Sequence, residues 1–209
     1  VFLAYATTSV VARALGAGSP TTAITAGLDG LWLALGLGTL AAIAVAATAD
    51  PLTAAFGASS ATGEQATIYL RIGALGLPSM LVLLAVTGAL RGLLDTRTPM
   101  VVAIAGFSLN IALNLVFIHG LHWGIAGSAW GTVIAQTAMA LALTAVLLRK
   151  ARAAHAPLRP HPGRVLAAAR NGIPLVVRTL ALRGAILLTV WAAAVLGDAP
   201  LAAHQIAAT

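Results

Sequence analysis

Amide and hydroxyl side chains recur at a spacing of four residues within two long apolar segments. Asn110 and Asn114 lie in the first segment, and Ser128, Thr132 and Gln136 lie in the second. A spacing of four places side chains on one face of an α-helix, so each segment is expected to carry one polar stripe. Polar side chains are costly in hydrocarbon and should therefore face a neighbouring helix or a water-filled cavity.

Two interpretations of these stripes are open. Asn, Gln, Ser and Thr side chains commonly hydrogen-bond across membrane helices, at about 0.6–2 kcal/mol each, and would then serve only packing. Alternatively, the stripes would join Tyr69, near the outer end of the preceding segment, in one pocket for a ligand or a cation. Spacing alone fits both interpretations.

Two arginines and one proline are also singled out by their positions. Arg178 lies about six residues inside an apolar segment, roughly 9 Å by the helical rise, and its side chain can extend to the interface. Arg183 is deeper, where a guanidinium costs about 3 kcal/mol and needs a partner or water, so both arginines are candidates to line a cavity. Pro78 removes a backbone hydrogen bond within its segment and is a candidate hinge.

The sequence indicates no enzyme chemistry. It has no Gly-Lys-Ser/Thr phosphate loop, no His-Glu-x-x-His zinc helix and no Gly-x-Ser-x-Gly elbow. The five acidic residues are expected near helix ends or in loops, which argues against a site with paired carboxylates. Cysteine is absent, which excludes a disulfide framework and a thiolate metal site, and neither a metal nor a cofactor is expected.

Composition places the chain in a membrane. The 209 residues are 60% hydrophobic and 8% charged, with a mean hydropathy of +0.97, whereas a soluble domain has about 25% charged residues. Six of the twelve Lys and Arg residues lie in one connector, between Arg149 and Arg170. This clustering is typical of cytoplasmic loops, so the charge of +7 argues for membrane topology and against a nucleic-acid partner.

Apolar segments long enough to cross the roughly 30 Å hydrocarbon layer define the expected helices. Two partial spans are expected, at residues 1–14 and from about residue 201, together with five that are nearly complete. The five lie at residues 23–49, 66–91, 98–118, 124–148 and 172–196. Residues 164–171 are expected to form a short interfacial helix. The fold class is therefore an all-α polytopic membrane protein.

The connectors between these segments alternate in charge. The basic side, which includes the hairpin with Arg91 and Arg97, is predicted to be cytoplasmic, and Arg71 on the acidic side is the exception. Prolines at 157, 160 and 162 forbid a continuous helix in the 150–164 stretch. We therefore expect a linker between two helical bundles there.

Six motifs, in order along nearly the whole chain, resemble those of multidrug and toxic compound extrusion (MATE) transporters, and of their DinF-like branch best. They are Thr7–Gly18, Leu90–Pro99, Asn110–Asn114, Gly124–Gln136, Arg178–Leu180 and Ala202–Ile206. The resemblance implies a twelve-helix, two-lobe fold, of which this chain would be a fragment from the end of helix 2 to the start of helix 8. Residues 1–149 would form N-lobe helices 2–6 without helix 1, residues 150–163 the cytoplasmic inter-lobe linker, and residues 164–209 the start of the C-lobe.

The resemblance also implies a function, namely cation-coupled efflux by alternating access. H⁺ or Na⁺ would enter as a drug or bulky organic compound leaves, with no cofactor besides the coupling ion. In archaeal relatives of this branch, an N-lobe network joins an acidic residue on helix 1 to a Tyr, an Asn, an Asp and a Thr. Tyr69, Asn110, Asn114 and Thr132 match the last four positions, and Gln136 extends the stripe of Thr132. Asn114 departs from the pattern, because an amide carries no proton at physiological pH; the titrating carboxylate would then lie on helix 1, and the choice of ion is open.

Two alternative functions remain open at this point. A lipid-linked oligosaccharide flippase of the same superfamily would have a cationic central cavity, which Arg178 and Arg183 would begin to line. A non-transport membrane scaffold would use its polar residues only for packing. For the efflux transporter, we expect small-molecule substrates, a surrounding lipid bilayer, a monomer, and a multi-pass location in the plasma (inner) membrane.

Overall fold

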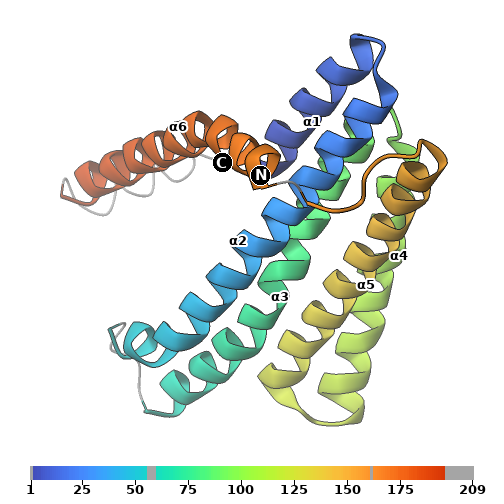
Figure 1. The fold of residues 1–209 in the computed structure, drawn as a ribbon. Helices are drawn as coiled ribbons and strands as arrows, with labels where there is room; N and C mark the ends of the chain where they lie inside the picture. The colour runs from blue at the N-terminus through green and yellow to red at the C-terminus, as the bar shows by residue number, and fades with distance from the viewer. Residues whose placement is uncertain (1, 56–59, 161, 196–209) are drawn as a thin grey trace. The chain divides into compact units, whose positions relative to one another are not determined.

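The computed structural model describes residues 2–55, 60–160 and 162–195, and every regular element in them is helical (Figure 1). The elements are α1 (Phe2–Gly16), α2 (Pro20–Ala55), α3 (Ser60–Gly92), α4 (Arg97–Asn114), the π-helical turn η1 (Leu115–Gly120), α5 (Gly124–Ala153) and α6 (Pro162–Val195). Five helices in these ranges are long and apolar enough to cross a membrane. The predicted all-α membrane fold is thereby confirmed.

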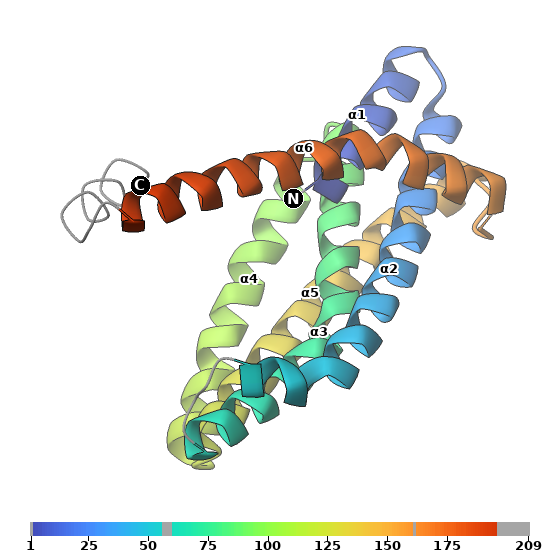
Figure 2. The same ribbon diagram turned by 90° about the vertical axis from the view of Figure 1, so that its left-hand side faces the viewer.

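The helices fall into two compact units. The first contains residues 3–169 and the second begins at Arg170, inside α6. Within the first unit, α2 packs along α3, α3 packs along α5, and α5 packs along α4 (Figures 1 and 2). The helices α3, α4 and α5 thus bring the two predicted polar stripes and Tyr69 into one neighbourhood.

The structure differs from the sequence-based expectation at the start of α6. Residues 164–171 and 172–196 were expected as an interfacial helix and a separate span, but α6 is one helix from Pro162 to Val195. The 164–171 stretch is rich in Ala, Leu and Arg, which favour helix, and the turn-forming pair Asn171–Gly172 continues as helix. Pro174 removes only one backbone hydrogen bond, so the helix continues through it.

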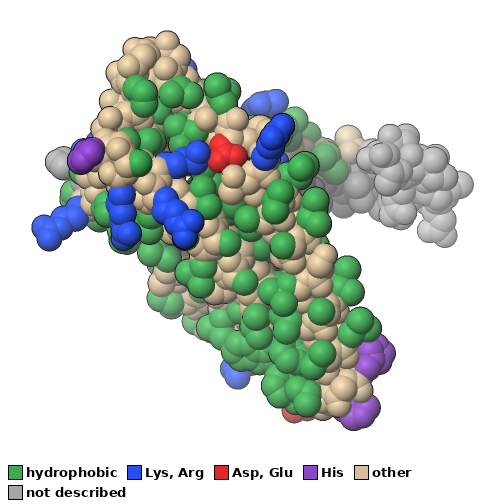
Figure 3. Space-filling view, turned by 90° about the vertical axis from the view of Figure 1, so that its right-hand side faces the viewer, with side chains coloured by type: hydrophobic (Ala, Val, Ile, Leu, Met, Phe, Trp, Pro, Cys, Tyr) green, Lys and Arg blue, Asp and Glu red, His purple; other side chains and the backbone are tan. Residues whose placement is uncertain are grey.

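Charged side chains of the first unit gather towards its two ends (Figure 3). Figure 3 shows most of the visible Lys and Arg side chains gathered at one end of the face, histidine side chains at both ends, and hydrophobic side chains along the length between them. Arg71, the predicted exception, forms an ion pair with Asp50, with 2.7 Å between Arg71 Nη2 and Asp50 Oδ2. The basic charge at the acidic end is therefore balanced by a neighbouring helix.

Glycines let the helix backbones approach closely, as is typical of membrane helices. A Cβ added at Gly38 of α2 would lie 2.5 Å from Cα of Pro78 in α3. A Cβ added at Gly88 of α3 would collide with the backbone oxygen of Ala4 in α1, and Thr8 Oγ1 donates to the carbonyl oxygen of Gly88 at 3.0 Å. Backbone-to-backbone contact therefore fixes the spacing of α1, α2 and α3.

The hairpin between α3 and α4 is fixed by Asp95. Its Oδ1 accepts a hydrogen bond from the backbone N–H of Thr98 at 3.1 Å, and its Oδ2 accepts one from Thr98 Oγ1 at 3.0 Å. Lys150 of α5 lies 3.2 Å from the same Oδ2. Partial burial raises the pKa of Asp95, but the hydrogen bonds from Thr98 and the charge of Lys150 outweigh it, so the pKa lies below its usual range.

We expect Thr98→Val to raise the pKa of Asp95 and to reduce stability by about 1–2 kcal/mol at neutral pH. Because the folded-state pKa of Asp95 is lowered, its contribution is present above the unfolded-state pKa and disappears as pH falls through the folded-state value. Thermal unfolding of the unaltered protein between about pH 6 and pH 3 should therefore converge with that of the variant at the acidic end. Thr96→Val, at a neighbouring exposed hydroxyl, is the matched control. Parallel curves for both variants would contradict this role of Asp95.

Candidate functional site

A chain of hydrogen bonds joins the polar stripes of α4 and α5. Asn114 Nδ2 donates to Asn110 Oδ1 at 3.2 Å, and Asn110 Nδ2 donates to Thr132 Oγ1 at 3.4 Å. Thr132 Oγ1 donates in turn to the carbonyl oxygen of Ser128 at 3.0 Å. The structure therefore brings the stripe of Asn110 and Asn114 on α4 into contact with Thr132 of the stripe on α5.

The amide oxygen of Asn114 is the open end of this chain. Among the described residues, Asn114 Oδ1 is buried and has no hydrogen-bond partner. It faces Gly131 of α5 so closely that a Cβ added there would lie 2.9 Å from it. A buried oxygen without a partner is costly, and it is free to accept a hydrogen bond or to coordinate a cation.

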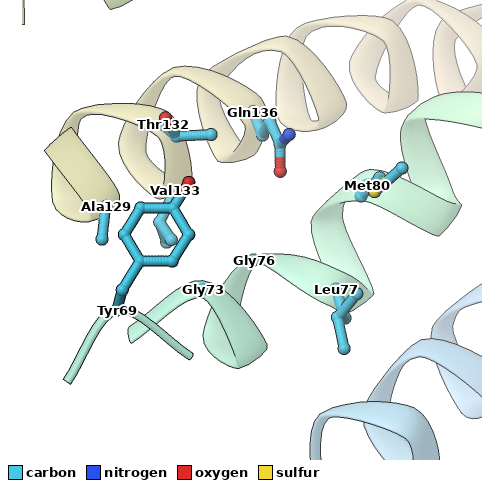
Figure 4. A pocket seen from close by; sticks show the side chains of 9 residues that line it. All are labelled: Tyr69, Gly73, Gly76, Leu77, Met80, Ala129, Thr132, Val133 and Gln136. Carbon is cyan, nitrogen blue, oxygen red and sulfur yellow. The ribbon is translucent and has the colours of Figure 1, made fainter. Parts of the chain in front are cut away.

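Tyr69 of α3 lines a small pocket of about 150 Å³ beside these residues (Figure 4). In Figure 4 its side chain extends from α3 towards α5, where Thr132 and Gln136 also line the pocket. Gly76 leaves room for the Gln136 side chain on this side of α3, because a Cβ added there would lie 3.2 Å from Gln136 Oε1. A water molecule occupies about 30 Å³ of liquid, so the pocket has room for a few waters or a partly hydrated cation.

A second, larger cavity of about 590 Å³ adjoins the first between α3, α4 and α5. Its walls are mostly apolar, and Met80, Thr132 and Gln136 line both spaces. Asn110 lines the large cavity as well, and Arg91 contributes the charged side chain. The volume and the apolar character are those of sites for drug-sized organic molecules. The polar network therefore forms part of the wall between a water-sized pocket and a drug-sized cavity.

Other predicted residues are not part of this site. Arg178 is an exposed residue of α6 in the second unit, and the side chain of Arg183 lies outside the described set. Pro78 lies within α3, which continues through it as one helix, and its backbone contacts the Gly38 position. The motif at Ala202–Ile206 also lies outside the described residues.

Two polar contacts of the first unit were missed in the sequence. Asp29 lies inside α2, is 5% exposed, and pairs with Arg164 of α6 at 2.9 Å, which corrects the expectation that all acidic residues lie near helix ends or in loops. The signal was present, because Asp29 lies six residues into the predicted 23–49 span. Ser79 Oγ of α3 and Thr137 Oγ1 of α5 lie 2.9 Å apart and share a hydrogen bond that links these two helices.

The C-terminal end of α4 is irregular directly after Asn114. Directly after Asn114, η1 replaces the α-helical turn, and the backbone N–H of Leu121 donates to the carbonyl oxygen of Val116, five residues earlier, at 2.8 Å. The Phe117 ring stacks on Trp123 with 5.1 Å between the ring centroids. Single π-turns of this kind are frequent beside functional sites.

This chain is similar in sequence to one family of proteins and to individual members of related groups. The sequence model of the MatE family matches residues 1–116. Protein DETOXIFICATION 43 of Arabidopsis thaliana is 38% identical over 143 residues, covering 66% of this chain and 26% of that protein. The DNA damage-inducible protein F of Escherichia coli (strain K12) is 36% identical over 141 residues, covering 68% of this chain and 31% of that protein.

A solved structure extends the similarity to the fold. It is described as the inward-facing conformation of a multidrug resistance MATE family transporter of the MOP superfamily. It superimposes with a TM-score of 0.70 and 27% sequence identity, covering 83% of this chain and 40% of that chain. The chain thus spans about a quarter to two fifths of the length of these three proteins.

Proposed function

Because this chain belongs to the MatE family, we propose that it is part of a transporter that exports drugs or other bulky organic compounds in exchange for H⁺ or Na⁺. The observation that carries the proposal is that the small pocket and the large cavity have wall residues in common. Thr132 and Gln136 line both the water-sized pocket and the drug-sized cavity. An ion bound on one side and an organic molecule on the other would therefore contact the same two side chains, which is how binding of one can alter binding of the other.

On the ion side, the residues offer neutral oxygen atoms. Tyr69, Thr132 and Gln136 line the pocket with hydroxyl or amide oxygens, which suit a hard cation such as Na⁺. Asn110 and Asn114 are linked to this wall through the hydrogen bond from Asn110 to Thr132. Among the described residues that line the pocket, none is a carboxylate. Proton coupling through this site would therefore need an acid from outside this chain, whose proton could be shared with the open oxygen of Asn114.

On the substrate side, the cavity has mostly apolar walls and few polar groups. Met80, Met100 and Met139 line it, and methionine side chains adapt their shape to different ligands. This lining fits a broad range of amphipathic compounds and names no single substrate. We place the transporter in the plasma membrane as a monomer, with the basic hairpin on the cytoplasmic side.

Export of a fluorescent organic cation from vesicles that contain the parent transporter tests the proposal. We expect export to stop when the H⁺ or the Na⁺ gradient is removed, and Tyr69→Phe to slow it about tenfold, since one hydrogen bond to the ion site contributes about 1–1.5 kcal/mol. Tyr5→Phe is the matched control, because Tyr5 is 67% exposed on α1. Export that needs neither gradient and is unchanged by Tyr69→Phe would overturn the antiporter and favour the flippase.

A further inference from the structure

The stretch between α5 and α6 is attached to α2 along its length. We call this stretch together with the first three residues of α6 the strap; it comprises residues 154–160 and 162–164. Thr21 Oγ1 donates to the carbonyl oxygen of Ala154 at 3.5 Å, and Trp32 Nε1 donates to that of Leu158 at 3.2 Å. Arg164 Nε, just inside α6, donates to Asp29 Oδ2 at 2.9 Å. Figure 1 shows the chain passing from the end of α5 to the side of α2 before α6 begins.

The ion pair between Asp29 and Arg164 is the strongest of these attachments. The Asp29 side chain is 7% exposed and that of Arg164 is 42% exposed. Exposed ion pairs contribute little, but a buried carboxylate without a partner is strongly destabilising. Asp29 therefore requires a cation at this position, and Arg164 is the one that the described residues supply.

The rest of the strap is built to stay ordered. Prolines at 157, 160 and 162 fix φ at their positions. The segment would therefore gain less conformational entropy if it detached from α2. Ala156 follows the last turn of α5, where its N–H donates to the carbonyl oxygen of Ala151 at 2.9 Å, and it is only 7% exposed. A linker that moved freely in water would leave this methyl group exposed. The segment is therefore packed against the first unit between two polar anchors.

We propose that Asp29 and Arg164 lock the strap to α2, so that the strap moves with the first unit and positions the start of α6 instead of acting as a flexible linker. The next interruption along the chain is Pro174, which cannot donate a backbone hydrogen bond to Arg170. Movement between the lobes would then be taken up near Gly172–Pro174 and not in the strap. The consequence for transport rests on the proposed function, whereas the attachment of the strap does not.

Cysteine labelling tests the attachment directly, because this chain contains no cysteine. In the parent transporter, with any other cysteines removed, Ala156→Cys is expected to react with a thiosulfonate reagent at least about tenfold more slowly than Ala153→Cys, which lies at an exposed position. Adding Asp29→Asn should raise the Ala156→Cys rate towards the Ala153→Cys rate. Asp50→Asn is the matched control, because Asp50 forms an exposed ion pair at the other end of α2.

A second pair of variants separates release of the strap from misfolding. Arg164→Lys keeps the positive charge and should keep Ala156→Cys protected, whereas Arg164→Gln should expose it. A normal Ala153→Cys rate and a single gel-filtration peak show that each variant is folded. Equal labelling of Ala156→Cys and Ala153→Cys without further change, or protection that survives both Asp29→Asn and Arg164→Gln, would overturn the proposal.

Transport measurements test the positioning role. We expect Asp29→Asn to lower the maximal export rate and to leave the apparent substrate affinity unchanged, because the cavity lies between α3, α4 and α5. Full export with an exposed Ala156→Cys would overturn this role of Asp29. If the unaltered transporter shows normal protection but no export, the proposed function fails while the attachment of the strap is supported.

Discussion

Replacing Asn110 with leucine is expected to reduce ion-coupled export about a hundredfold while the protein still inserts into the membrane. Asn110 accepts a hydrogen bond from Asn114 and donates one to Thr132. Leucine removes both, at about 1–1.5 kcal/mol each, and two such contacts correspond to roughly a hundredfold in a rate or binding constant. Insertion should be preserved, because leucine is favourable at the centre of a membrane helix.

The measurement is the gradient-driven export rate per folded molecule, with the folded amount determined by gel filtration. Ser108→Ala is the control on the same helix, since Ser108 is exposed and distant from the network in helical register. A scaffold whose polar residues serve only packing predicts the opposite pattern for Asn110→Leu. Its stability would change, and its export rate per folded molecule would be the same as that of the unaltered protein.

Replacing Gly38 with alanine is expected to destabilise the protein by about 3 kcal/mol, a large effect for one methyl group. The new Cβ would lie 2.5 Å from Cα of Pro78 and 3.1 Å from the carbonyl oxygen of Leu77. Both are backbone atoms, which cannot move aside by changing a rotamer, so α2 and α3 would have to separate. Loss of the gel-filtration peak, or a large fall in Tm, is the expected result.

Gly36→Ala is the control for this substitution. Gly36 lies two residues away on the same helix, it is exposed, and a Cβ there would meet no atom within 4 Å. Comparing Gly38→Ala with Gly36→Ala also tests whether the helices can separate at Pro78, the predicted hinge. Equal stability of the two variants would mean that α2 and α3 separate easily at Pro78, which would contradict the tight contact described above.

Local sequence patterns predicted the parts of this fold that depend on neighbouring residues. The length of the apolar runs predicted the spans, and the four-residue spacing predicted that Asn110 and Asn114 share one helix face and that Thr132 and Gln136 share another. Prolines in the 150–164 stretch predicted that α5 would end before α6 begins, as it does at Ala153. These inferences need only helical periodicity and hydropathy.

Contacts between distant residues were beyond such patterns. Asp29 and Arg164 are 135 residues apart, and nothing in the local sequence of either selects the other. The large cavity depends on how three helices pack, and the backbone contact between Gly38 and Pro78 depends on the register of α2 against α3. Roles for the network residues remain predictions, because geometry shows their contacts and transport assays report their function.

The π-helical turn after Asn114 has a consequence for how chains of this kind tolerate insertions and deletions. A turn closed by bonds five residues apart holds one residue more than an α-helical turn, so η1 stores a one-residue surplus at the outer end of α4. Loss of one residue there returns the turn to α-helical geometry and changes the path to Trp123. Asn110 and Asn114 precede the surplus and keep their register against α5. Related chains can therefore differ by one residue in this turn while the spacing of the polar network is preserved.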